Sequence, residues 1–183
     1  GSADDFTIEV EVWHDDPTNT NFDPIVAWHK DAHGQSCSYT GGAMNAGAGF
    51  VLQVQGGTAP QNNGKVFPGN VNFFMGQGDS VTARTVDMSG GVLPAGQWVS
   101  IKVTMRSNVV TLSVNGVVKG TATFSGTKQF SSTAPVTIGQ YMCDSHNQFW
   151  DGQMRYVKIT SGTDGGMGAM SPTLSTHGGD GIR

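Results

Sequence analysis

The sequence has few charged residues, few cysteines and no long apolar run. Charged residues make up 13% of the 183 residues, the formal net charge is −4, and no run of lysine or arginine could follow a phosphate backbone. We therefore expect no nucleic-acid partner. No apolar stretch approaches the roughly 20 residues that cross a bilayer, and the first residues lack the basic and apolar regions of a signal peptide. We therefore expect a soluble chain without membrane insertion.

No segment of the sequence convincingly predicts a helix, and no repeat of fixed period is present. The chain contains 27 glycines, which weaken helices and favour turns between short strands. Its hydrophobic content of 37% is enough for one core in a chain of this length. These features predict a single all-β domain.

The predicted strands are short segments in which apolar and polar residues alternate. In "FTIEVEVW" (6–13), Phe6, Ile8, Val10 and Val12 share one face, and the intervening residues, which end with Trp13, share the other. The other predicted strands are 24–30, 49–55, 71–76, 80–88, 98–105, 109–115, 117–124, 135–142 and 149–159. About ten strands, each with one wet face, predict two packed antiparallel sheets.

The segment "VVTLSVNGVVKG" (109–120) predicts a hairpin, because Asn115 and Gly116 can supply the two positive φ angles of a type I′ turn. With "GQWVSIKVTM" before it and "FWDGQMRYVKI" after it, the segment order from Phe6 to Ile159 resembles the laminin-G-like domains of the concanavalin A-like lectin/glucanase superfamily. The resemblance implies a jelly-roll sandwich of two antiparallel sheets. Such domains usually have one more strand before the segment that corresponds to "FTIE".

We divide the chain into three parts. Because it begins with Gly1 and Ser2 and not with Met, we interpret residues 1–5 as a cloning remnant and lead-in to a domain excised from a longer protein. Residues 6–160 form the predicted sandwich. Residues 161–183 are a Gly-rich tail or linker, or alternatively pack one extra strand onto the sandwich.

The resemblance implies either a binding module or an enzyme. Our first hypothesis is a non-catalytic carbohydrate-binding or adhesion module of a secreted, cell-surface or phage-tail protein, which places it outside the cell, on the cell surface or in a virion. Its partner would be a glycan or glycoconjugate, and it would be joined to the remainder of a multidomain chain. The alternative is a structural or protein-binding spacer domain of the same fold.

A glycoside hydrolase is the second alternative. The resemblance includes retaining glucanases of this fold, in which a strand motif Glu-x-Asp-x-x-Glu supplies a nucleophile and a general acid. The matching stretch here is "EVEVWH", in which Glu9 and Glu11 share a face but His14 stands at the third acidic position. The sequence contains no other glutamate, so we do not expect an enzyme.

A calcium site is implied by the resemblance, because many laminin-G-like domains hold this ion. Calcium takes six to eight oxygen ligands, and the densest cluster of candidate side chains lies in "HDDPTNTNFDP", with Asp15, Asp16, Asn19, Asn21 and Asp23. Aspartate and asparagine also form turns by capping their own backbone, which is the alternative explanation.

Cys37 and Cys143 are the two cysteines, and both lie in polar loops that follow a predicted strand. Exposed thiols are unfavourable in an oxidising compartment unless they are paired. We therefore expect a disulfide between them, and two free thiols are the alternative.

A sugar site should combine aromatic faces for the C–H groups of the ring with polar partners for its hydroxyls. Two predicted loops have this mixture, "AWHKDAHGQSCSY" (27–39) and "CDSHNQFWDG" (143–152), and a disulfide would hold them side by side. The candidate ligand-binding residues are Trp28, His29, Tyr39, Asp144, His146, Asn147 and Trp150. The alternative location is the concave sheet face that carries Lys102, Thr104 and Arg106.

Overall fold

The structure, a computed structural model, describes residues 5–18, 23–29, 49–55, 68–76, 84–125, 136–140 and 149–161. Within these ranges it contains ten strands. They are β1 (Phe6–His14), β2 (Asp23–His29), β3 (Gly49–Val54), β4 (Asn70–Gly76), β5 (Arg84–Val92), β6 (Trp98–Arg106), β7 (Val109–Val114), β8 (Val117–Thr123), β9 (Thr137–Ile138) and β10 (Gly152–Ser161). No helix lies among the described residues, and none there could cross a bilayer.

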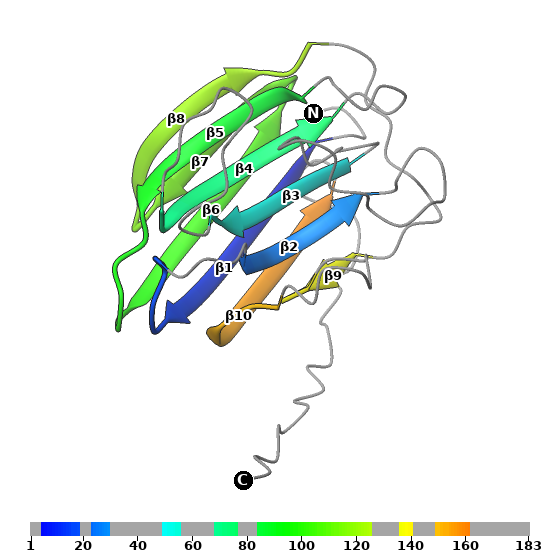
Figure 1. Cartoon of the computed structure of the whole chain (residues 1–183). Helices are drawn as coiled ribbons and strands as arrows, with labels where there is room; N and C mark the ends of the chain where they lie inside the picture. Colours follow the sequence, from blue (N-terminus) through cyan, green and yellow to red (C-terminus); the bar gives the residue numbers. More distant parts are fainter. Residues whose placement is uncertain are drawn as a thin grey trace, which may run out of the picture.

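The strands form two five-stranded antiparallel sheets that lie face to face (Figure 1). Sheet A has the order β10-β1-β6-β7-β8, and sheet B has the order β5-β4-β3-β2-β9. Consecutive strands β1 and β2 therefore belong to different sheets, as do β5 and β6. The predicted all-β sandwich of two antiparallel sheets is confirmed.

Strand β1 lies in the interior of sheet A, between β10 and β6. Its burial alternates as the sequence predicts, with Ile8, Val10 and Val12 at 0–1% exposure in the core. The intervening side chains therefore point away from sheet B, onto what we call the outer face of sheet A. The same alternation on β6 buries Val99, Ile101, Val103 and Met105 and turns Trp98, Ser100, Lys102, Thr104 and Arg106 to the outer face.

The core between the sheets contains an aromatic cluster near the first residue of β1. The ring of Phe6 stacks on Phe50 of β3 at 5.2 Å between centroids, and Phe73 of β4 lies 6.1 Å from Phe50. Since fully burying a Phe, Leu, Ile, Met or Val side chain stabilises a fold by about 1.5–3 kcal/mol, contacts of this kind hold the two sheets together.

Two hairpins in sheet A use two-residue turns with positive φ angles. Asn115 (φ 50°) and Gly116 (φ 76°) connect β7 to β8, which confirms the predicted hairpin. Ser107 (φ 48°) and Asn108 (φ 72°) connect β6 to β7 without a glycine, and the Ser107 amide donates a hydrogen bond to Asp5 Oδ1 at 2.9 Å. This second turn was not predicted, because serine is uncommon at positive φ.

A bulge and a glycine shape the start of β10. Glu11 pairs with Tyr156 but Val12 pairs with Met154, so Arg155 is an extra residue in β10 and shares the outer face with Tyr156. Gly152, which pairs with His14, has a φ of 151°, and a Cβ at this position would overlap the carbonyl oxygen of Trp13. This close approach of two backbones requires glycine.

We predict that Gly152→Ala destabilises the domain far more than Gly116→Ala does. Gly116 also has a positive φ, but a Cβ there would meet nothing within 4 Å. The Gly116→Ala variant therefore measures the cost of backbone strain without a steric overlap. Strain of this kind costs about 1 kcal/mol, or about 2–4 °C in Tm, and the overlap at Gly152 should at least double the loss. Thermal unfolding of both variants measures the difference, and equal Tm values would contradict the close approach.

Candidate functional site

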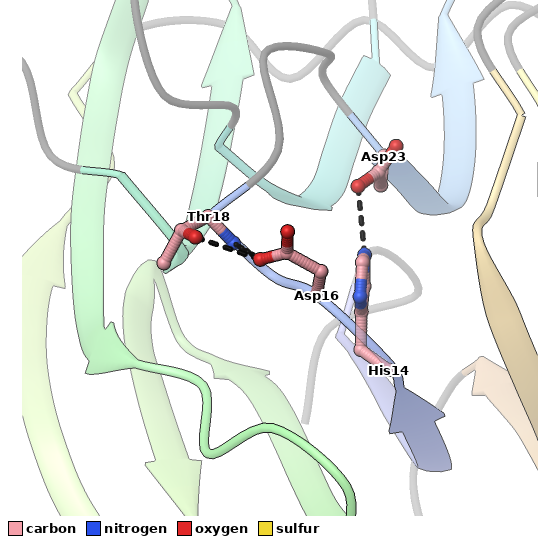
Figure 2. A network of polar contacts seen from close by, with 4 residues as sticks. All are labelled: His14, Asp16, Thr18 and Asp23. Atoms are coloured by element: carbon pink, nitrogen blue, oxygen red, sulfur yellow. Dashed lines mark hydrogen bonds and ion pairs between the residues drawn. The ribbon is translucent and has the colours of Figure 1, made fainter.

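A buried hydrogen bond joins the two sheets at the end of β1 that lies away from the phenylalanine cluster. Nε2 of His14, the last residue of β1, lies 2.7 Å from Oδ2 of Asp23, the first residue of β2, and both side chains are at most 2% exposed (Figure 2). Trp150 packs edge-on against His14 with 4.9 Å between ring centroids. A buried polar pair of this kind stabilises a fold while both partners are present.

The three described aspartates of the predicted calcium loop each have a local partner. Oδ1 of Asp15 accepts a hydrogen bond from Trp13 Nε1 at 2.9 Å, and Oδ1 of Asp16 accepts from the amide and the hydroxyl of Thr18 at 3.0 and 2.7 Å. Figure 2 shows Asp16 directed toward Thr18 while Asp23 is directed toward His14. The hydrogen bonds from Thr18 hold the pKa of Asp16 below its usual value.

These contacts match the turn-capping explanation for Asp16. Within the described ranges, no group of three His, Cys, Asp or Glu side chains is placed to hold a metal ion. Asn19 and Asn21 lie outside the described residues, and calcium binding by this loop stays a prediction.

The predicted sugar site is described only in part. Trp28 packs edge-on against Phe50, at 6.0 Å between centroids, and therefore lies near the end of the sandwich where β1 begins. Trp150 contacts His14, where β1 ends. The Trp150 amide donates a hydrogen bond to the Gly139 carbonyl, and the Gly139 amide donates one to Ile25 of β2, so Trp150 lies level with Ile25, about 10 Å along the strand direction from Trp28.

The two tryptophans therefore lie at different levels along β2, and both pack against the core. Phe149, in contrast, is 58% exposed, so Trp150 and not its neighbour Phe149 packs against the core. Of His29 only the backbone is described, at the end of β2. The remaining residues of the predicted site and the two cysteines lie outside the described residues, namely Tyr39, Asp144, His146, Asn147, Cys37 and Cys143.

The two candidate catalytic carboxylates lie on the outer face of sheet A, and cations surround them. Glu9 Oε1 lies 2.8 Å from Lys102 Nζ, and Glu9 Oε2 lies 4.0 Å from Lys158 Nζ. Glu11 accepts two hydrogen bonds from Arg155, at 2.8 Å from Nε and 2.5 Å from the terminal nitrogen.

The bidentate hydrogen bonds from Arg155 lower the pKa of Glu11 and raise that of Arg155. A general acid at neutral pH needs a raised pKa, which is the opposite of what Glu11 has. The neighbours of Glu11 thus suit a structural ion pair better than acid catalysis.

Sequence reasoning missed an aromatic cluster beside these charges. Trp13 and Trp98 are direct cross-strand partners on the outer face, with 6.0 Å between ring centroids and an edge-to-face geometry. The guanidinium carbon of Arg155 lies 4.5 Å from the Trp98 ring centroid, so Arg155 connects Glu11 to this aromatic pair. Both tryptophans are partly exposed. We call Glu11, Trp13, Trp98 and Arg155 the outer-face cluster.

The comparisons with known proteins agree with this fold. The laminin G model of the concanavalin A-like lectin/glucanases superfamily matches residues 2–163. The chain belongs to this superfamily. This confirms the resemblance seen in the sequence, while no curated protein sequence shows significant similarity to the chain.

Three solved structures are similar to the chain in fold. Domain 4 of AbnA, an extracellular arabinanase from Geobacillus stearothermophilus solved with arabinotriose, has 16% identity and a TM-score of 0.55, with 88% of this chain and 63% of that chain covered. The CBM40 of a Ruminococcus gnavus sialidase, bound to α2,3 sialyllactose, has 13% identity and a TM-score of 0.54, covering 89% and 80%. Domains LG4-5 of mouse laminin α1 have 15% identity and a TM-score of 0.54, covering 85% and 35%.

These identities are low, so the likeness concerns the fold. The chain spans less than two thirds of the arabinanase and laminin chains that it resembles.

The buried His14–Asp23 pair gives a first testable prediction for this region. Asp23→Ala leaves His14 buried without this partner and should reduce the free energy of unfolding by about 3 kcal/mol. His14→Ala and the double variant complete a double-mutant cycle, in which we expect a coupling of about 1 kcal/mol or more. Asp16→Ala, the same change at an exposed position of the same loop, should cost about 1 kcal/mol or less. Additive losses for the two buried residues, measured by urea unfolding, would contradict the pairing.

The pair of Glu11 and Arg155 gives a second prediction. Because Arg155 lowers the pKa of Glu11 below its ordinary 4.5, the pair stabilises the fold above that pH and loses its effect as the pH falls through the lowered pKa. Glu11→Gln should therefore have a lower Tm than the unchanged protein at pH 7, and the two Tm values should converge in acid. A Tm difference that stays constant from pH 7 into acid would show that the ion pair is not its source.

Proposed function

We propose that the protein is a non-catalytic carbohydrate-binding or adhesion module and that the outer-face cluster is its sugar-contacting surface. Membership of the concanavalin A-like lectin/glucanases superfamily supports carbohydrate binding. The observation that carries the proposal is the pair of partly exposed tryptophans, Trp13 and Trp98, which face away from the core. Core packing does not explain two indole rings in this position.

The chemistry of the cluster suits a sugar ring. Partly exposed indole faces and edges can pack against the C–H groups of a pyranose or furanose. The carboxylate of Glu11 and the guanidinium of Arg155 lie next to the rings and can exchange hydrogen bonds with hydroxyl groups. Each of these groups is already held by a neighbour, so a ligand would order few side chains on binding.

The charges around Glu9 and Glu11 favour binding without catalysis. Glu11 has a lowered pKa, and Glu9 lies between two lysines, so neither carboxylate resembles a general acid in its surroundings. In this proposal the module is part of a longer protein that acts outside the cell, on a cell surface or in a virion. Its partner is a glycan or glycoconjugate.

The test is a glycan array followed by titration of the best ligand. We expect saturable binding that weakens about tenfold or more in Trp98→Ala, because a tryptophan at the centre of a contact contributes about 2 kcal/mol. Val118→Ala, on β8 at the far edge of the same sheet and 59% exposed, is the matched control and should bind normally.

Two results would contradict this proposal. If no glycan on the array binds saturably, the spacer alternative is favoured. Unchanged binding by Trp98→Ala together with a loss in Trp28→Ala would place the site at the loop end predicted from the sequence.

A further inference from the structure

Positive charge gathers on sheet A of a protein that is acidic as a whole. The chain has a formal net charge of −4, but the only acidic residues in the five strands of sheet A are Glu9 and Glu11. The same strands carry the basic residues Lys102, Arg106, Lys119, Arg155 and Lys158. The negative charge of the protein therefore lies elsewhere, and this sheet has a local excess of cations.

The cations are ordered along β1. Arg106 donates hydrogen bonds to Thr7 Oγ1 at 3.0 Å and to the Phe6 carbonyl at 3.1 Å. Lys102 and Lys158 lie on the two sides of Glu9, and Arg155 lies at Glu11. Outward residues of a strand repeat about every 6.7 Å, so cationic groups accompany three successive outward positions of β1, and Trp13 with its partner Trp98 follows at the fourth.

The two glutamates do not neutralise this row. Glu9 faces two ammonium groups, and the nearer, Lys102, is 2.8 Å away. Lys158 Nζ lies 4.0 Å from Glu9 Oε2, which is longer than a hydrogen bond. The three N–H donors of Lys158 therefore make no hydrogen bond to that carboxylate oxygen. The side chains of Lys102, Lys158 and Arg155 are 49%, 44% and 54% exposed and remain accessible to a ligand.

From this arrangement we infer that the outer face of sheet A selects an acidic glycan, a sugar chain that carries carboxylate or sulfate groups. The inference rests on the proposed function and specifies its ligand class. Trp13 and Trp98 contact the sugar rings at one end of β1, and Lys102, Lys158 and Arg106 attract the acidic groups along the strand. Glu9 and Glu11 keep the cations in position, so the charges are arranged before the ligand arrives.

The experiment compares acidic glycans with neutral forms of the same backbone. The probes are an oligogalacturonide and its carboxyl-reduced form, and a carrageenan oligosaccharide and its desulfated form. We expect at least one acidic probe to bind about tenfold more tightly than its neutral counterpart at low ionic strength, with the difference shrinking as salt is added. A single-stranded DNA oligonucleotide serves as a polyanion without glycan structure and should bind more weakly than that probe.

The variants locate the charges. Lys158→Gln should weaken binding of the acidic probe about threefold to tenfold and leave the neutral probe unchanged. Lys119→Gln makes the same charge change on β8, at the opposite edge of sheet A, and should have no such effect. Thermal unfolding of both variants verifies that each is folded.

The outcomes separate this inference from the proposed function. Equal affinity for acidic and neutral probes, or array binding to neutral glycans only, would overturn the acidic-glycan inference and leave carbohydrate binding standing. Equal losses in Lys158→Gln and Lys119→Gln, or DNA binding as tight as that of the acidic sugars, would overturn the inference in favour of general attraction to polyanions. Absence of binding to any glycan would overturn both.

Discussion

The pairing of β1 with β6 on one side and β10 on the other is the interaction on which the rest of the structure depends. It places Ile8, Val10 and Val12 in the core between the sheets. The same register places Glu9 and Glu11 beside the cations of both neighbouring strands. Because side chains in a strand alternate with a period of two, a slip of one residue would bury the glutamates and expose the core residues. Core formation and the charged surface are therefore fixed by one register.

The two ends of the sandwich are closed by different chemistry. Aromatic stacking of Phe6 on Phe50 joins the sheets where β1 begins, and the buried hydrogen bond from His14 to Asp23 joins them where β1 ends. Loss of one partner should destabilise the polar end, because a buried histidine or carboxylate without its partner is costly in free energy. The loop between β1 and β2 leaves from this polar end, so the pair fixes where the loop begins and where it returns.

Local patterns were sufficient to predict much of the fold. The alternation in β1 and the Asn115–Gly116 turn were both confirmed, because each depends on neighbouring residues only. The predicted strand 80–88, which the structure describes from Arg84 onward, continues to Val92 through Gly90 and Gly91, which look like a strand end in the sequence. A Cβ on Gly90 would lie 3.0 Å from atoms of Val71 and Val114, so tight packing between the sheets explains this glycine.

The outer-face cluster could not be predicted in the same way. The alternation of residues 6–13 predicts that Trp13 lies on the polar face of its strand, but only the pairing of β1 with β6 shows that Trp98 is its neighbour. Arg155 reaches Glu11 and Trp98 from the bulge in β10, and bulges depend on contacts between strands that one sequence does not reveal. The loop-end site was predicted from composition, which does not give the positions of Trp28 and Trp150 relative to each other.

The central claim is that a sugar contacts the outer face of sheet A, and NMR of the tryptophan side chains tests it most directly. The chain contains four tryptophans, so a ¹H–¹⁵N spectrum resolves one indole N–H signal for each of Trp13, Trp28, Trp98 and Trp150. Addition of a glycan that the protein binds should shift the signals of Trp13 and Trp98 and leave Trp28 and Trp150 in place. Shifts confined to Trp28 or Trp150, with Trp13 and Trp98 unmoved, would contradict the account.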